Sequence, residues 1–263
     1  MTGRVALFSS ALPGWDAERV VAAAVSLGLA AVEWGVGPGQ ALSGPDDGAR
    51  IAALCADAGL AVAGVAVQDR DVTPATPKAG AAHVALAREL RAPHVRFFAP
   101  FYQGGPLRAG QRRARAGVDA LVELAAGLPV LVETAPETLA ASPELALELV
   151  GHHPARLAGV LYDPGNMAIE GHLAAPLALA VLGRHLRHVH VKNISWSRRG
   201  GVWRWAYADL DRGVVEWPAT LRALRAAGYR GRLSIDHLSR RPTPGLLAAE
   251  SERLGEMLEQ AGA

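Results

Sequence analysis

The sequence predicts an α/β fold, a single (β/α)8 barrel of the TIM type that spans residues 1–263 as one domain. The main observation is a set of eight short apolar runs whose midpoints recur about every 30 residues, the length of one βαβ unit. A second observation is the helical spacing of apolar residues between these runs. The chain length of 263 residues also agrees with the roughly 250 residues of a typical barrel of this kind.

The expected strands are apolar and often β-branched. They lie at 5–9, 30–36, 61–67, 94–99, 129–134, 157–163, 187–193 and 232–238. Several are apolar at successive positions, as in Val160-Leu161-Tyr162, which is typical of parallel strands buried on both faces. Helices are indicated where apolar residues recur at i, i+3, i+4 and i+7 and so form one buried face. These residues are Val20, Ala23, Ala24 and Leu27, then Ile51, Leu54, Cys55 and Ala58, and finally Val118, Leu121, Val122 and Ala125.

The competing fold is a doubly wound open sheet, which usually carries a glycine-rich turn after its first strand. Here the first expected strand continues into Ser9-Ser10-Ala11-Leu12-Pro13-Gly14, which matches neither the dinucleotide-binding pattern nor a P-loop. No linker-like segment divides the sequence into two parts. The barrel is therefore the expected fold.

Composition argues against several kinds of partner. The chain has 27 basic and 25 acidic residues, a formal charge of +2, so no strong field attracts nucleic acid or an anionic membrane. A single cysteine, Cys55, excludes an intrachain disulfide and a thiolate zinc cluster, and its place on an apolar helix face indicates a buried thiol. Without a secretory apolar segment or a run of about 18 apolar residues, a cytoplasmic protein is expected. Association with further copies of the chain stays open.

The polar residues that end the expected strands are rich in metal ligands. In a barrel of this type the active site lies at the carboxyl ends of the strands, so these side chains converge although they are far apart in sequence. Glu133, Asp163, His190 and Asp236 follow four different runs. Three oxygen ligands and one nitrogen ligand suit Mn²⁺, Mg²⁺, Co²⁺ or Zn²⁺. The sequence therefore predicts a divalent metal site.

These motifs resemble those of the sugar phosphate isomerase/epimerase family, the xylose isomerase-like barrels that include ketose 3-epimerases, hydroxypyruvate isomerase and inosose dehydratases. The motifs are Glu133 after a strand, Tyr162-Asp163-Pro164-Gly165-Asn166, His188-Val189-His190-Val191-Lys192-Asn193, Gly213-Val214-Val215-Glu216-Trp217, and Gly228-Tyr229-Arg230-Gly231 before Ser234-Ile235-Asp236-His237. The resemblance implies a metal held by Glu133, Asp163, His190 and the residue at position 236. It also implies that the first and last carboxylates form the catalytic acid/base pair.

The resemblance implies a metal-dependent isomerase or epimerase that removes a proton next to the carbonyl of a small polyhydroxy substrate. Asp236 departs from the usual Glu and is one methylene shorter, which puts two-base epimerisation in question more than metal binding. Three alternatives stay open: an inosose dehydratase-like lyase, a non-catalytic relative that only binds a ligand, and an endonuclease IV-like phosphodiesterase. The last would need further strand-end histidines and a more basic surface.

Further residues near the strand ends are candidates for substrate binding. Lys192 and His188 are expected to orient substrate oxygens, and Arg96 to bind a carboxylate or phosphate. Glu33 is a fourth candidate, with a helix cap or a pairing with arginine as its alternative.

Other polar residues are interpreted as structural. Asn166 is expected to serve only the turn after Asp163, His237 to face away from the site, and His152 and His153 to lie on the surface. The aromatic-rich segment 194–217 is expected either to form a lid over the substrate or to pack on the barrel rim or on a second subunit.

Overall fold

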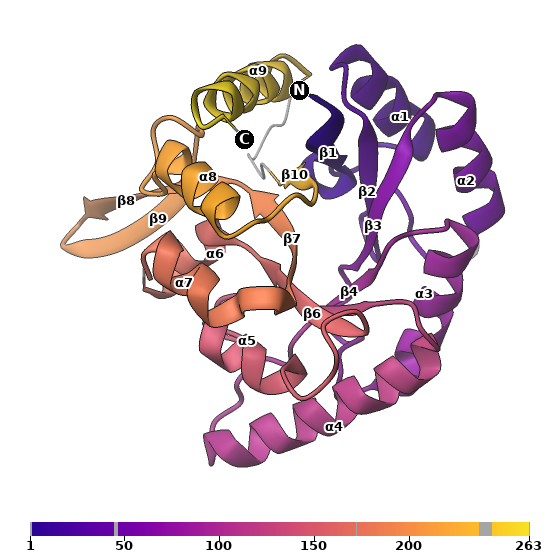
Figure 1. Ribbon diagram of the computed structural model, residues 1–263, viewed down its shortest axis with the longest axis vertical. Coiled ribbons are helices and arrows are strands. Elements are labelled where there is room, and N and C mark those ends of the chain that lie inside the picture. Colours follow the sequence, from indigo (N-terminus) through magenta and orange to yellow (C-terminus); the bar gives the residue numbers. More distant parts are fainter. Residues whose placement is uncertain (1, 45–46, 172, 237–243, 263) are drawn as a thin grey trace.

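Eight parallel strands close into a barrel in this computed structural model, in the order β1-β10-β7-β6-β5-β4-β3-β2. Helices surround the barrel (Figure 1). The structure describes residues 2–44, 47–171, 173–236 and 244–262. The barrel strands are β1 (Val5–Phe8), β2 (Ala31–Val36), β3 (Ala61–Val67), β4 (Val95–Phe98), β5 (Val130–Glu133), β6 (Ala158–Tyr162), β7 (Leu186–Val191) and β10 (Leu233–Ile235). The predicted (β/α)8 fold is therefore confirmed.

The helices follow the strands along the chain, as βαβ units require. They are α1 (Ala17–Ser26), α2 (Gly48–Asp57), α3 (Pro77–Glu89), α4 (Leu107–Ala125), α5 (Pro143–Val150), α6 (Pro164–Glu170), α7 (Ala175–Leu182), α8 (Trp217–Ala226) and α9 (Pro244–Gln260), with short 3₁₀ turns at Thr2–Arg4, Ser9–Ala11 and Gly183–His185. The three helices expected from apolar spacing correspond to α1, α2 and α4. Cys55 is buried on α2, as predicted.

All eight predicted strands are present, with ends shifted by a few residues. The largest shift concerns the last run, where the described strand is Leu233–Ile235 and the expected one was 232–238. His237, which was expected to face away from the site, lies outside the described residues.

The two faces of the barrel wall differ in chemistry. Val130 and Val132 of β5 belong to the main apolar cluster, which also contains Leu121 of α4, so this face packs against the helices. Side chains in strands alternate in direction, and the neighbouring Glu133 instead contacts Arg96 of β4 and Asn166 of α6. Apolar burial therefore stabilises the helix layer and leaves the interior free for polar groups.

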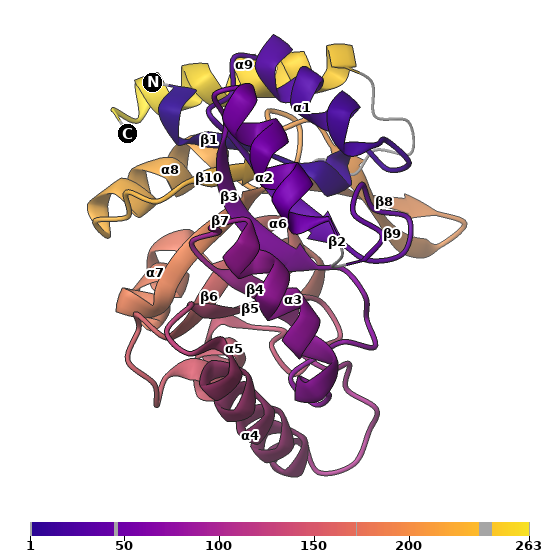
Figure 2. The same cartoon turned by 90° about the vertical axis from the view of Figure 1, so that its right-hand side faces the viewer.

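Segment 193–208, within the aromatic-rich stretch, forms an antiparallel hairpin of β8 (Asn193–Arg199) and β9 (Val202–Ala208). The hairpin projects from the barrel, and its strand β8 contacts α6 (Figures 1 and 2). Asn193 fixes its base, because its Nδ2 donates to the carbonyls of Leu210 and Val215, both at 2.9 Å, and its Oδ1 accepts from the amide of Val215. An added Cβ at Gly213 would collide with the Asn193 side chain, which explains the glycine there.

The two chain ends lie close together near α9 in both ribbon views (Figures 1 and 2). Among the described helices, none by itself has the length and apolar character needed to cross a membrane. Among the described residues, the segments 164–170 and 175–185 meet the length and hydropathy criteria only when they are taken together. The angle between these two segments is 109°.

The glycines of two helices provide a matched test of the packing. An added Cβ at Gly117 of α4 would collide with the backbone carbonyl of Pro74, whereas one at Gly255 of α9 meets no atom within 4 Å. We expect Gly117→Ala to lower the free energy of unfolding by about 1–3 kcal/mol through overpacking. Gly255→Ala should raise it by up to about 1 kcal/mol through helix propensity. Urea unfolding of both variants measures this, and equal effects would contradict the close approach of α4 to Pro74.

Candidate metal centre

The four predicted ligands lie on four adjacent strands. Glu133 ends β5, Asp163 follows β6, His190 lies within β7 and Asp236 follows β10, and these strands are consecutive in the barrel. Atom Nδ1 of His190 lies 3.7 Å from Oε1 of Glu133, 3.8 Å from Oδ2 of Asp163 and 3.5 Å from Oδ2 of Asp236. The structure therefore brings the predicted ligand set together at the carboxyl end of the barrel.

The donor set fits a divalent ion. The buried His190 Nδ1 makes no hydrogen bond although three carboxylates surround it, and Glu133, Asp163 and His190 each offer a ligand atom within 4.8 Å of the others. The interior also has a charge imbalance. Its buried carboxylates are Glu33, Glu133, Asp163 and Asp236, and its buried basic side chains are Arg96 and Lys192. Four carboxylates against two basic groups leave two negative charges in excess when His190 is neutral, as a metal ligand must be, and one when it is protonated.

Local hydrogen bonds fix the direction of Asp163. Its Oδ1 caps helix α6 by accepting from the amide of Asn166 at 2.9 Å, and its own amide donates to Oγ1 of Thr134 at 2.9 Å. With Oδ1 engaged at the helix start, Oδ2 is the atom directed toward His190. The Asp-Pro-Gly-Asn sequence thus begins a helix and orients a candidate ligand at the same time.

Glu133 is held from two sides. Its Oε2 lies 2.9 Å from Nε of Arg96, and its Oε1 accepts from Nδ2 of Asn166 at 3.0 Å. Asn166 Nδ2 also donates to the carbonyl of Thr134 at 3.0 Å. Asn166 was expected to serve only the turn, and this was wrong, because its side chain reaches back across the strand end to the neighbouring carboxylate.

Arg96 is engaged within the protein and not free for an anion. It is completely buried, its Nη1 donates to the carbonyl of Val67 at 2.8 Å, and its Nε faces Glu133. The position favours a role in holding Glu133 over the predicted binding of a substrate carboxylate or phosphate.

Lys192 lies among the ligands. Its Nζ is 2.7 Å from Oδ2 of Asp163 and 2.7 Å from Oδ2 of Asp236. Burial opposes ionisation of Asp236, but Lys192 outweighs it and lowers the pKa of this carboxyl to about 2. Burial dominates at Asp163 and raises its pKa to about 6. A Cβ at Gly165 would lie 2.6 Å from Cγ of Lys192, so this glycine makes room for the lysine.

A second layer of polar residues lies around the other ring nitrogen of His190. Its Nε2 lies 3.1 Å from Oε2 of Glu33. The same Glu33 oxygen also lies 3.1 Å from Nε2 of His188. This His188 nitrogen in turn lies 2.8 Å from Oγ of Ser234. Burial opposes the charged form of His190, but Glu33 and Glu133 raise its pKa to about 10. The two histidines lower the pKa of Glu33 well below its usual value despite burial. Glu33 and His188 therefore orient His190.

Two further groups of possible metal ligands occur among the described residues. Glu33, His94 and His188 form a buried group inside the barrel, where burial lowers the pKa of His94 to about 3. On the outside, His152 and His153 both contact Oδ1 of Asp119, at 2.5 and 2.8 Å. The expected surface position of these two histidines is confirmed.

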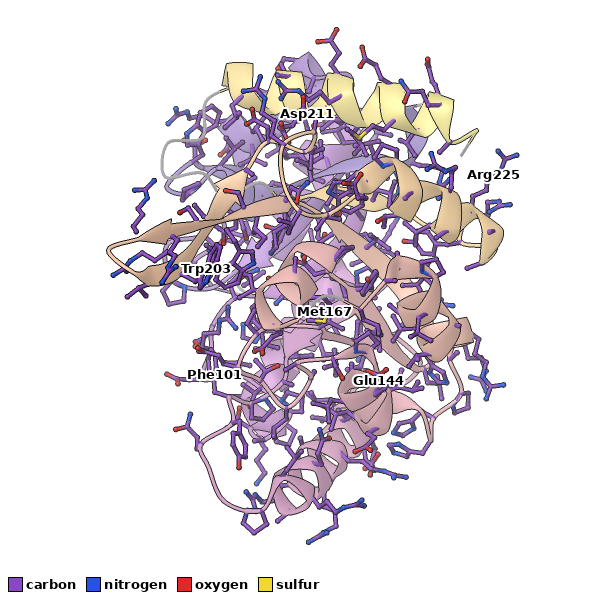
Figure 3. The ribbon with its side chains drawn as sticks, turned by 90° about the vertical axis from the view of Figure 1, so that its left-hand side faces the viewer. Phe101, Glu144, Met167, Trp203, Asp211 and Arg225 are labelled. Carbon is purple, nitrogen blue, oxygen red and sulfur yellow. The ribbon has the colours of Figure 1, made fainter. Side chains whose placement is uncertain are left out.

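A cavity of 400 Å³ opens above the candidate metal centre. Its lining includes Phe8, Ser10, Gln40, Gln68, Arg70, Arg96, Phe98, Phe101, Glu133, Glu137, Asn166, Lys192, Trp205, Tyr207 and Asp236. Of the four predicted substrate-binding residues, Lys192 and Arg96 reach this surface, whereas Glu33 and His188 do not. Figure 3 labels Trp203 on the hairpin and, below it, Phe101, which is one of the cavity residues.

Sequence reasoning missed several cavity residues. Trp205 and Tyr207 come from the hairpin, where the aromatic composition was noticed but the strand pairing was not. Their ring centroids are 5.4 Å apart, with the rings nearly perpendicular. Arg70, in the connection after β3, carried no motif that pointed to the site.

The model for the family described as xylose isomerase-like TIM barrel matches residues 21–257. The chain belongs to this family. A search of the curated proteins found no match to the sequence. Members of the xylose isomerase-like TIM barrel group appear among the similar solved structures, and at the identities found the likeness is one of fold.

Three of these structures illustrate the range. A xylose isomerase-like TIM barrel protein from Mycobacterium smegmatis in complex with magnesium has a TM-score of 0.75 and 16% identity, over 100% of this chain and 98% of that one. An L-ribulose 3-epimerase has a TM-score of 0.78 and 21% identity, over 99% and 96%. A probable 3-DHS dehydratase from Bacillus anthracis has a TM-score of 0.73 and 19% identity, over 96% and 98%.

Removal of single ligands tests the candidate metal centre. We expect His190→Ala and Asp163→Asn each to weaken Mn²⁺ binding strongly, because an incomplete ligand set loses both charge and geometry. Asn retains the oxygen that caps α6, so the second variant should stay folded. Metal content after dialysis against Mn²⁺ measures the effect, with the exposed Glu144→Gln as control. Unchanged metal content in both variants would eliminate the site.

The carboxylate behind His190 gives a second test. We expect Glu33→Gln to weaken Mn²⁺ affinity about 10- to 100-fold, the usual effect of losing a partner that orients a ligating histidine. Isothermal titration with Mn²⁺ measures the change, again against Glu144→Gln. An affinity equal to that of the unaltered protein would show that His190 does not need Glu33.

Proposed function

We propose that the protein is a divalent-metal-dependent enzyme that abstracts a proton next to the carbonyl of a small polyhydroxy compound, with isomerisation or epimerisation as the outcome. The observation that carries the proposal is the arc of Glu133, Asp163, His190 and Asp236 beneath a cavity of 400 Å³. When bound, a divalent ion would polarise the substrate carbonyl and stabilise the charge that develops on oxygen. The L-ribulose 3-epimerase and the magnesium-bound protein support the assignment by their likeness of fold.

Glu133 is the side chain we assign as the base. It lies at the cavity surface and Arg96 and Asn166 hold both of its oxygens, so its direction is set before a substrate arrives. Preorganisation of this kind lowers the cost of reaching the geometry for proton transfer. Lys192, which also lines the cavity, is placed to donate hydrogen bonds to substrate oxygens.

Asp236 is less suited to be a second base. Lys192 lies 2.7 Å from its Oδ2 and helps to lower the pKa of this carboxyl to about 2, so the carboxylate accepts a proton poorly. Its side chain is also one methylene shorter than the usual Glu. Both features favour proton transfer on one face of the substrate through Glu133.

One-face chemistry leaves elimination as the second candidate. A base that removes a proton beside a carbonyl also starts the loss of a β-hydroxyl group, which is the reaction class of a dehydratase. The probable 3-DHS dehydratase among the similar structures has this activity in its name. The contact of 2.7 Å between Lys192 Nζ and Asp236 Oδ2 is the observation that favours this alternative.

Exchange of substrate hydrogen in D₂O tests the proposal without knowledge of the product. Protein loaded with Mn²⁺, Mg²⁺, Co²⁺ or Zn²⁺ is mixed with D-fructose, D-tagatose, L-ribulose, an inosose or 3-DHS, and loss of C–H signals is followed by NMR. We expect exchange with at least one compound, and none after EDTA treatment. A metal-loaded protein that exchanges no hydrogen in any of them would overturn the proposal.

On the best compound, Glu133→Gln should lower kcat by about 10²- to 10⁴-fold at saturating Mn²⁺, with a smaller change in KM. Gln keeps the shape and one oxygen of Glu but is no base at neutral pH. Steady-state kinetics of this variant and of Glu144→Gln provide the comparison. Near-normal kcat in Glu133→Gln would exclude this residue as the base.

The short carboxylate at position 236 gives a separate expectation. Misplacing a catalytic group by about 1 Å can cost around 10²-fold in rate, so Asp236→Glu should raise the ratio of C3 epimerisation to one-face exchange while Mn²⁺ stays bound. Product analysis by NMR measures this ratio. Efficient 3-epimerisation by the unaltered protein that Asp236→Asn abolishes, with metal retained, would instead identify Asp236 as a competent second base.

A further inference from the structure

Arg70 is a basic side chain in the cavity that no part of the proposed chemistry uses. It lies in the connection between β3 and α3 and lines the same cavity as Glu133 and Asp236. Its guanidinium carbon is 3.5 Å from the ring centroid of Phe98 and 5.3 Å from that of Phe101. Within the described part of the chain, no carboxylate forms an ion pair with Arg70 and its guanidinium donates no hydrogen bond.

The other basic groups at this surface are already paired. Arg96 lies 2.9 Å from Glu133, and Lys192 lies 2.7 Å from both Asp163 and Asp236. Among the described residues that line the cavity, Arg70 therefore carries the positive charge without a partner. An anion that entered the cavity would meet its strongest attraction there.

The aromatic contacts position Arg70 without using its hydrogen-bond donors. A guanidinium stacked on an aromatic ring keeps its N–H groups in its own plane, directed away from the ring. These groups match the two oxygens of a carboxylate or phosphate in a bidentate arrangement. Phe98 and Phe101 thus hold the guanidinium at the cavity wall through contacts that do not use its hydrogen-bond donors.

The position of Arg70 relative to the metal centre indicates which part of a substrate it meets. In the closed barrel β3 lies opposite β7, the strand that carries His190. The Arg70 guanidinium itself lies over Phe98 of β4, the register partner of Glu133 on β5, so a substrate with its carbonyl beside Glu133 would meet Arg70 with a group farther along its carbon chain.

We propose that Arg70 binds an anionic group, a carboxylate or a phosphate, at the end of the substrate remote from the reacting carbon. The inference rests on the proposed function for the placement of the carbonyl, and it assigns the substrate class as acidic sugars or sugar phosphates. Glu137, on the same cavity lining, carries the opposite charge and forms no ion pair with Arg70 among the described contacts. It is the internal competitor that an experiment has to separate from a bound anion.

Three compounds that differ only at carbon 6 distinguish the possible anions: D-fructose, D-fructuronate and D-fructose 6-phosphate. Isothermal titration into Mn²⁺-loaded protein should give at least about tenfold tighter binding for one of the two anions than for fructose, as expected of a bidentate charged contact. The compound with the larger gain in affinity over fructose shows whether the site prefers a carboxylate or a phosphate. Equal affinity for all three compounds would overturn the proposal.

Variants then assign the preference to Arg70. Arg70→Ala should remove the advantage of the anion, and Arg70→Lys should keep part of it, since a point charge lacks the paired donors. Arg204→Ala, an exposed arginine on β9 outside the cavity lining, is the matched control and should keep the full advantage. The measured quantity is the ratio of the affinity for the anion to the affinity for fructose. If Arg70→Ala only disturbed the packing around Phe98, the affinities for all three compounds would fall alike and this ratio would not change. An anion preference that survives Arg70→Ala would refute the assignment.

Glu137→Gln tests whether Glu137 competes with a substrate anion for Arg70. With Arg70 reserved for a substrate anion, removal of this opposite charge should leave the preference unchanged or increase it. A loss as large as that in Arg70→Ala would show that Arg70 acts through Glu137, and would overturn the proposal. The binding measurement does not depend on turnover, so the two hypotheses can fail separately. If the protein prefers the anion but exchanges no hydrogen, only the proposed function is contradicted. If it exchanges hydrogen but its anion preference does not depend on Arg70, only the present inference is contradicted.

Discussion

Four carboxylates lie buried inside the barrel, and the positions of most other polar side chains there follow from the need to neutralise them. An unpaired buried charge is costly, so each carboxylate has a basic group or a hydrogen-bond donor beside it. Arg96 faces Glu133, and Lys192 faces Asp163 and Asp236. The remaining excess of negative charge surrounds His190 Nδ1, an arrangement that suits a divalent cation.

The barrel tolerates this interior because its stability comes from the other face of the wall. Strand residues such as Val132 and Val160 join the helices in one large apolar cluster. On the inward face Ala6, Ala31 and Ala63 form a small separate apolar cluster. Alternation along each strand therefore separates the residues that hold the fold from those that form the site.

The site is asymmetric. Glu133 lies between the Arg96 guanidinium and the Asn166 amide, and Asp236 lies beside the Lys192 ammonium group. In the proposed reaction the two carboxylates at the ends of the arc are assigned different tasks, Glu133 proton transfer and Asp236 ligation. The cavity lining also includes Arg70, whose guanidinium lies over Phe98 and Phe101, so a bound substrate would meet chemically different groups along its length.

The sequence by itself determined the barrel and the identity of the candidate ligands. Eight apolar runs at regular spacing specify parallel strands, and the carboxyl ends of such strands meet at one mouth, so Glu133, Asp163, His190 and Asp236 were predictable from local patterns. Cys55 was likewise predictable, because helical spacing alone places it on the buried face.

Only the tertiary structure decided which polar groups pair with one another. The contact of His188 with Glu33 joins residues 155 positions apart, and that of Lys192 with Asp236 joins residues 44 apart. A periodic pattern within a short stretch of sequence does not indicate contacts between residues so far apart in the chain. For the same reason Arg96 proved to be a partner of Glu133, Asn166 a support of the site, and the unpaired Arg70 a feature visible only once the other basic groups had found their carboxylates.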